Sequence, residues 1–156
     1  MEMKVVTESL KASFDRGWEF LNQIIEVCPD DVWNKKAGGY YFWQQLYHCF
    51  ACADIFIMPK GGALENPDIA LFKTELQSAM SKEEVKKFGS KMKGKADAWI
   101  ESLDDAALCE IHEGFSEKRG SPVTNALAFT AMISHSSYHI GSCDAILRDN
   151  GQKGVL

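Results

Sequence analysis

The sequence predicts an all-α protein, a four-helix bundle with a long connection between its second and third helices. Three observations lead to this prediction. Apolar residues recur at three- and four-residue steps over four long stretches, the alternation typical of strands is almost absent, and 156 residues suit one domain with a single core. We therefore expect one bundle domain over residues 1–156.

The first two helices are predicted from apolar spacing and the prolines that follow it. The first runs from Val6 to Cys28 and ends at Pro29; the second runs from about Tyr40 to Met58 and ends at Pro59. The apolar face of the first helix consists of Val6, Leu10, Phe14, Trp18, Leu21, Ile25 and Cys28.

The third helix is predicted from Ser81 to Leu103. Ser81 is the expected N-cap, and Glu84 stands at the capping-box position three residues later. The long connection before it has room for a short additional helix between Asn66 and Ala79. A connection of this length can cross the bundle instead of returning directly.

The fourth helix is predicted to start at Ser121, with Pro122 in the first helical position, and to end at Asn150 and Gly151. It would contain about 28 residues and be roughly 42 Å long.

Composition excludes several classes of function. The net charge of −5 and pI of about 5.4 argue against a nucleic-acid partner, and we interpret the basic stretch 86–95 as a solvated helix face. No stretch approaches the roughly 18 apolar residues of a membrane span, and the N-terminal segment carries charges throughout. Five cysteines without regular spacing indicate a reduced protein, so we expect a cytoplasmic location.

Two histidines one turn apart are the strongest functional signal. On a helical wheel His135 and His139 lie about 40° apart, just inside the edge of a broad apolar face. The opposite face carries Thr130, Ser137, Asp144 and Arg148. Buried imidazoles need partners, and two that are four residues apart converge on one cation. The alternative is a pair of core histidines bonded to neighbouring side chains.

His48 is the candidate third ligand. It lies in the middle of the second helix, which is apolar nearly all round, and it meets His135 and His139 at similar depth if the two helices are neighbours. Imidazole ligands suit zinc, nickel, copper and iron alike. Cys52 lies one turn after His48 and is either a fourth ligand or a small core residue. His112 stands among charges and glycines, and we interpret it as a surface loop residue.

Other side chains near the histidines offer fewer clues. Asp54 and Asp144 are either carboxylates that orient a ligand imidazole or, more simply, solvated helix residues. Tyr138 is expected to face a neighbouring helix. Cys49 and Cys52 form a CxxC, but its place inside a helix argues against a thioredoxin-like role. No residue is assigned as an acid, base or nucleophile.

Two segments resemble the DinB-like (DinB/YfiT) family of metalloenzymes: YHCFACADIF, which contains His48, and HSSYHIGSCDAILRDNG, which contains His135 and His139. The resemblance implies a four-helix bundle that holds a divalent metal (zinc, nickel or iron) through His48, His135 and His139. It also implies a homodimer and, from relatives, transferase or isomerase chemistry on low-molecular-weight thiols. One departure is that Ser142 and Cys143 follow the motif glycine, where the family often has glutamine.

These observations leave two classes of function open. One is a metal-dependent enzyme acting on a small molecule, either a thiol transferase or a hydrolase, because a metal with an open position acidifies a bound thiol or water. The other is a non-catalytic bundle that binds a metal or serves as a dimeric interaction or stress protein. A cavity that opens to solvent at the histidines would favour the enzyme, and a site closed by Cys52 would favour the alternative.

Overall fold

The chain folds almost entirely into helices, so the all-α prediction is confirmed. The computed structural model describes residues 4–70 and 79–156. The helices in chain order are α1 (Val5–Val27), α2 (Asp30–Trp33), α3 (Phe42–Ala51), α4 (Ala53–Ile57), α5 (Pro67–Ala70), α6 (Lys82–Glu101), the 3-10 helix η1 (Ala107–Cys109), α7 (Glu113–Arg119) and α8 (Asn125–Asp149). Two short antiparallel strands, β1 (Lys36–Ala37) and β2 (Tyr40–Tyr41), form a hairpin before α3.

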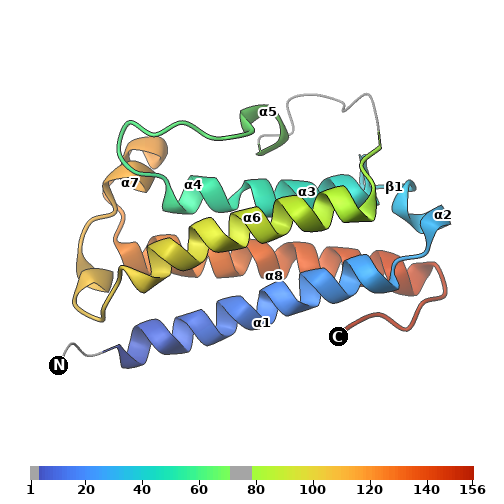
Figure 1. Cartoon of the computed structure of the whole chain (residues 1–156), viewed down its shortest axis with the longest axis horizontal. Helices are drawn as coiled ribbons and strands as arrows, with labels where there is room; N and C mark the ends of the chain where they lie inside the picture. The colour runs from blue at the N-terminus through green and yellow to red at the C-terminus, as the bar shows by residue number, and fades with distance from the viewer. Residues whose placement is uncertain (1–3, 71–78) are drawn as a thin grey trace.

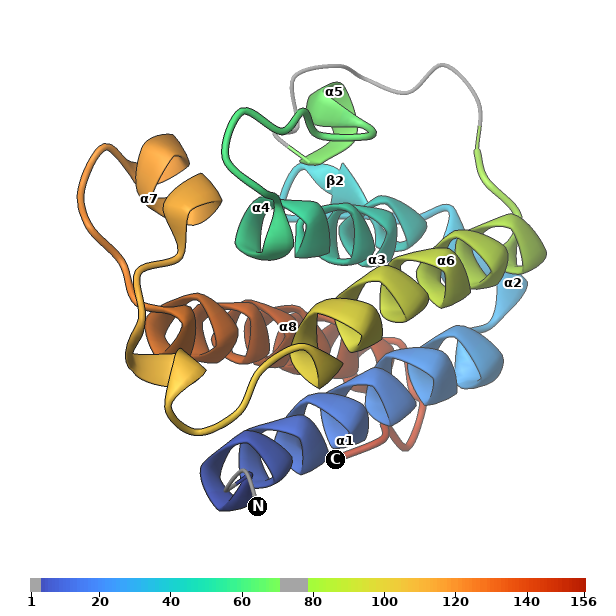
Figure 2. The ribbon, with the colours of Figure 1, turned by 60° about the vertical axis from the view of Figure 1, so that its left-hand side comes forward.

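The long helices enclose one apolar core. Helix α1 packs against α6 and α8, and α3 packs against the same two helices from the other side (Figures 1 and 2). The largest fully buried side chains are Trp43, Phe14, Phe42, Phe50, Phe129, Leu21, Ile24, Ile25, Leu46, Met92, Ile100 and Met132. Gly89 allows a close approach of α6 to α3, because a Cβ there would lie 2.8 Å from the Phe50 ring. The α3–α8 contact is the one that positions the candidate site.

The predicted limits of the first and third helices agree with the structure to within a residue or two. Pro29 follows α1 and is the N-cap of the one-turn helix α2. At the start of α6 the capping box is present: the Glu84 amide donates to Ser81 Oγ at 3.2 Å, and the Ser81 amide donates to a Glu84 carboxylate oxygen at 2.8 Å. Apolar spacing and the following proline were therefore sufficient for the first helix, and the capping box was sufficient for the start of the third.

The second predicted helix is not continuous. Tyr40 and Tyr41 belong to the hairpin, and the helix is interrupted at Cys52, which ends α3 and precedes α4. The interruption is mild, since the Cys52 amide still donates to the His48 carbonyl at 2.9 Å. Cys52 therefore stays on the same side of the chain as His48.

The predicted start of the fourth helix at Ser121 and Pro122 is wrong. Thr124 is the N-cap instead, and its hydroxyl accepts from the Leu127 amide at 3.2 Å. The preceding residues are extended because they pair with the segment before α7, where the His112 amide donates to the Val123 carbonyl at 2.8 Å. Such a long-range contact is invisible to a local capping rule.

The long connection contains the short helix α5, inside the segment Asn66–Ala79 where an additional helix was predicted. The remainder of that prediction, at 71–78, lies outside the described residues. Among the helices of the described ranges, none combines the length and the apolar character that a bilayer crossing requires.

Candidate metal centre

Three histidines from two facing helices lie together in the core. His48 comes from the middle of α3, and His135 and His139 come from successive turns of α8. The ring centroids are 5.3 Å apart for His48 and His135, 5.0 Å for His48 and His139, and 4.6 Å for His135 and His139. The rings of the three residues selected from the sequence therefore lie near one another, which required α3 and α8 to be neighbours. The group whose ligand atoms all lie within 4.8 Å of one another is His48, Cys52 and His135, without His139.

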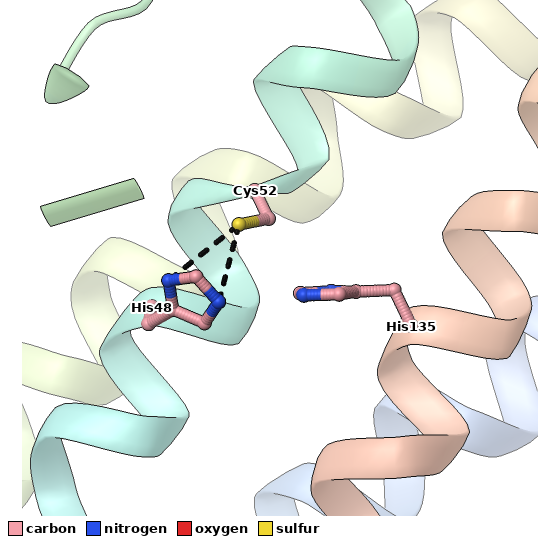
Figure 3. Close-up of side chains that lie close together, drawn as sticks. All are labelled: His48, Cys52 and His135. Atoms are coloured by element: carbon pink, nitrogen blue, oxygen red, sulfur yellow. Dashed lines mark hydrogen bonds between the residues drawn. The ribbon is translucent and has the colours of Figure 1, made fainter. Parts of the chain in front are cut away.

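The histidines point inward, as the helical wheel predicted. The side chains of His48 and His139 are buried, and His135 is partly buried against the Phe56 ring, with centroids 5.8 Å apart. Figure 3 shows His135 of α8 extended towards His48 and Cys52 across the interface. Both helices thus supply donor atoms to one small volume.

Burial keeps the imidazoles of His135 and His139 neutral. Desolvation, followed by the neighbouring histidines, lowers the pKa of His139 to about 3; desolvation and His48 lower the pKa of His135 to about 4. A neutral imidazole is the form that binds metals. At neutral pH His135 and His139 therefore offer uncharged nitrogen donors.

The facing ring nitrogens of His135 and His139 are the observation that tests whether a metal fits. His139 Nε2 lies 3.2 Å from His135 Nε2, whereas the buried His139 Nδ1 has no hydrogen-bond partner among the described residues. Two neutral ring nitrogens facing each other need a shared proton or a cation between their lone pairs. Two such nitrogens 3.2 Å apart are a donor pair of the kind that a divalent transition metal accepts.

Cys52 belongs to the same cluster. Its Sγ lies 3.6 Å from His48 Nδ1 and 3.5 Å from His48 Nε2, as the dashed lines of Figure 3 indicate. Ligand atoms of His48, Cys52 and His135 all lie within 4.8 Å of one another, so this group could hold a metal ion. Burial raises the pKa of the Cys52 thiol to about 12, so without a cation the side chain is a protonated thiol.

The two nearby aspartates have other roles. The interpretation of Asp54 and Asp144 as solvated is wrong, since both side chains are buried. Asp54 pairs with Lys95 and accepts from the Glu65 amide at 3.1 Å. Asp144 accepts from Arg148 Nε at 2.7 Å and from the amides of the two C-terminal residues, Val155 and Leu156. These contacts hold segments of the chain in place and do not orient an imidazole.

Two further expectations are corrected. His112 is not a surface loop residue: it is buried, and as the N-cap of α7 its Nδ1 accepts from the Phe115 amide at 3.1 Å. Its place just before a short amphipathic turn was the signal that could have revealed this role. Tyr138 does not face a neighbouring helix but is 71% exposed, with its ring against the edge of His139 at 5.1 Å between centroids.

A cavity of about 340 Å³ reaches the cluster from the side of His139. Its walls come from α8, α3 and the β1–β2 hairpin, and the lining includes Tyr40, Gln45, Tyr138, His139 and Ser142. Gln45 Oε1 accepts from Ser142 Oγ at 3.0 Å, so the two polar lining groups are fixed relative to each other. Sequence reasoning missed Gln45 and the hairpin, because only the fold brings them beside α8.

Comparison with known proteins identifies the fold. No protein-family model matches the sequence, and no curated protein matches it either. Among solved structures, the crystal structure of a DinB-like protein from Bacillus cereus ATCC 10987 is similar, with a TM-score of 0.72, 16% sequence identity, and coverage of 100% of this chain and 99% of that chain. The chain therefore has the fold of a DinB-like protein, and at this identity the likeness concerns the fold.

Proposed function

We propose that the protein is a DinB-like four-helix bundle, with the long connection between its second helical segment (α3 and α4) and its third (α6). The bundle binds one divalent transition metal through His48, His135 and His139. It uses this metal to transfer a low-molecular-weight thiol. The observation that carries the proposal is the meeting of three imidazole rings, from α3 and α8, beside a cavity that reaches His139.

When bound, a divalent metal would deprotonate a coordinated thiol and so generate the reactive thiolate. Zinc, nickel and iron all accept imidazole ligands, so the histidines alone leave the metal open. The chain's own residues would hold the ion and shape the cavity. The fixed Gln45–Ser142 pair would offer hydrogen bonds to a small substrate, and the exposed Tyr40 and Tyr138 rings would form an apolar rim.

A second candidate function is a non-catalytic metal-binding protein. Its support is the position of Cys52, because a fourth protein ligand leaves no open position on a tetrahedral metal. A hydrolase is a third use of the same histidines, since three neutral ligands also acidify a bound water. The cavity beside His139 supports the enzyme over the closed structural site.

The testing experiment is elemental analysis of protein purified without a histidine tag, followed by a transfer assay that joins a small thiol to a chlorinated nitrobenzene. We expect about one equivalent of a transition metal in the wild type and none in His135→Ala/His139→Ala. His112→Ala is the matched control, because it removes a buried histidine outside the cluster. A protein that takes up no metal after reconstitution with zinc, nickel and iron would exclude the proposal.

The proposal also includes a homodimer and a small-molecule thiol as the partners, without nucleic acid or membrane. Light scattering of the purified protein tests the dimer independently of the metal. A monomer would remove the dimer from the proposal and leave the metal site unaffected.

A further inference from the structure

We propose that the cavity beside His139 takes a small molecule that carries a positively charged amino group, and that the carboxylate of Asp149 binds this group at the far end of the cavity. The inference rests on the proposed function for the chemistry near His139. It deepens that function, because it adds a positive charge to the description of the substrate.

The cavity follows one face of α8. Its lining includes four residues at three- and four-residue steps, which therefore share a face of the helix: Tyr138, Ser142, Ala145 and Asp149. His139 and Asp149 also both line it, and they stand ten positions apart in α8, which corresponds to about 15 Å along the helix axis. A ligand that extends along this face thus reaches Asp149 with the end that lies away from His139.

Asp149 gives the cavity a single sign of charge. Among the described residues that line the cavity, it is the one side chain with a formal charge. Gln45, Ser142 and the two tyrosines are uncharged, and burial keeps His139 neutral by lowering its pKa to about 3. A cavity lined by one sign of charge concentrates ligands of the opposite sign.

The carboxylate of Asp149 is not used within the fold. Over the described ranges it has no hydrogen-bond or ion-pair partner, although basic side chains lie near this end of α8. Arg148 is paired with Asp144, and Lys35 donates to the side-chain oxygen of Asn150 at 2.5 Å. Of the two aspartates of α8, Asp144 therefore serves the structure and Asp149 is available to a ligand.

The end of the helix strengthens the preference for a cation. Asp149 is the last residue of α8, where the backbone carbonyls carry a partial negative charge. The hairpin that supplies Tyr40 to the cavity lies at this same end of the bundle (Figure 1), and the face of a phenol ring also attracts a cation.

An ammonium group suits these features better than other charged groups do. A carboxylate or a phosphate would be repelled by Asp149. A metal ion such as calcium needs six or more oxygen ligands, of which a single carboxylate supplies at most two. An amino group needs one anionic partner and can donate further hydrogen bonds.

Binding of three six-carbon compounds to the full-length, metal-free protein tests the proposal. Hexylammonium, hexan-1-ol and hexanoate share an alkyl chain and differ in charge. Two-dimensional amide NMR measures their dissociation constants from the shifts of Tyr138, Ser142 and Asp149. We expect hexylammonium to bind about three- to five-fold more tightly than hexan-1-ol, and hexanoate to bind most weakly. The preference for hexylammonium should decrease as salt is added.

Asp149→Asn keeps the size of the side chain and removes its charge, so hexylammonium should then bind no more tightly than hexan-1-ol. Glu101→Gln is the matched control, because it removes an exposed carboxylate at the last residue of another long helix, α6. This variant should keep the full preference.

Equal binding of the three compounds to the wild type would overturn the proposal, as would a preference that survives in Asp149→Asn. Amide shifts that are absent or lie away from the cavity with all three compounds would overturn it too. Because the titration uses metal-free protein, a chain that takes up no metal would contradict the proposed function without changing this result, so the two failures are distinguishable.

Discussion

Two buried polar side chains that lie a few residues apart on α8 differ in how completely they are hydrogen-bonded. Asp144 on α8 is fully partnered, since Arg148 and two backbone amides bond to its carboxylate. His139, five residues earlier on the same helix, keeps a buried Nδ1 without a hydrogen bond among the described residues. Hydrogen bonds satisfy the buried carboxylate of Asp144, whereas the ring of His139 is only partly satisfied.

A missing partner alone does not mark a functional residue, because His112 Nε2 and Trp43 Nε1 are also buried without one among the described residues. His139 differs from them because the rings of His48 and His135 lie beside it.

The largest effect we expect is the loss of bound metal, because metal binding depends on the histidine cluster and not on Asp144. His135→Ala/His139→Ala should lose the metal completely, while Asp144→Ala should keep one equivalent. Inductively coupled plasma mass spectrometry of both variants, beside the wild type, measures this. Full metal content in His135→Ala/His139→Ala would show that the histidine cluster is not needed for metal binding, and would contradict the comparison between His139 and Asp144.

The second effect is the pH dependence of the metal-free protein. In the unfolded chain a histidine takes up a proton near pH 6.5, but the folded protein protonates His135 only at about pH 4 and His139 at about pH 3. Below about pH 6.5 the unfolded state therefore binds more protons than the folded state. As a result, the free energy of unfolding that is present above pH 6.5 is lost as the pH falls towards 4. At about 1.4 kcal/mol per pKa unit, the loss is on the order of several kcal/mol.

Urea unfolding after chelation, at pH 7 and at pH 4.5, tests this expectation. A variant without the pair, His135→Phe/His139→Leu, should show a clearly smaller decrease between the two pH values. Equal decreases in the two proteins would assign the acid sensitivity to carboxylates instead.

The third effect concerns the partnered side of the comparison. Asp144→Ala removes the acceptor for Arg148 and for the amides of Val155 and Leu156, and we expect a loss of about 2–3 kcal/mol in the free energy of unfolding. Asp149→Ala, an exposed aspartate on the same helix, is the control and should change it by about 0.5 kcal/mol or less. Thermal or urea unfolding of the metal-free proteins measures both; similar values for the two would mean that the contacts of Asp144 are not stabilising.

The smallest effect is at His112, a buried histidine with a structural hydrogen bond. His112→Ala removes the N-cap of α7 and should cost about 1 kcal/mol without altering metal content. His112→Asn retains a capping oxygen and should recover most of the loss. Reduced metal content in His112→Ala would show that His112 contributes to metal binding, as we expect for His48, His135 and His139.

Much of the fold and of the site was predictable because it depended on local patterns. Helical periodicity identified the long helices, and the helical wheel predicted that His135 and His139 face the core. The features that were missed depend on contacts between distant segments. Asp144 lies on the polar side of α8 and is buried only because the C-terminal residues fold back on it. His112 is buried by the pairing of its strand-like segment with Val123.

Cys52 shows where sequence reasoning reached its limit. Its spacing from His48 made it a candidate ligand, but spacing alone could not separate a ligand from a core residue. The distance that matters, between its sulfur and the nitrogens of His48 and His135, depends on how α3 meets α8. The cavity beside His139 was missed for the same reason, because its walls come from three separate elements.

The interruption between α3 and α4 has a mechanical consequence. Cys52 stands at a joint in the helical rod, and α4 beyond the joint carries Asp54, tied to α6, and Phe56, which lies against His135. A change in the backbone at Cys52 would therefore move the Phe56 ring relative to His135.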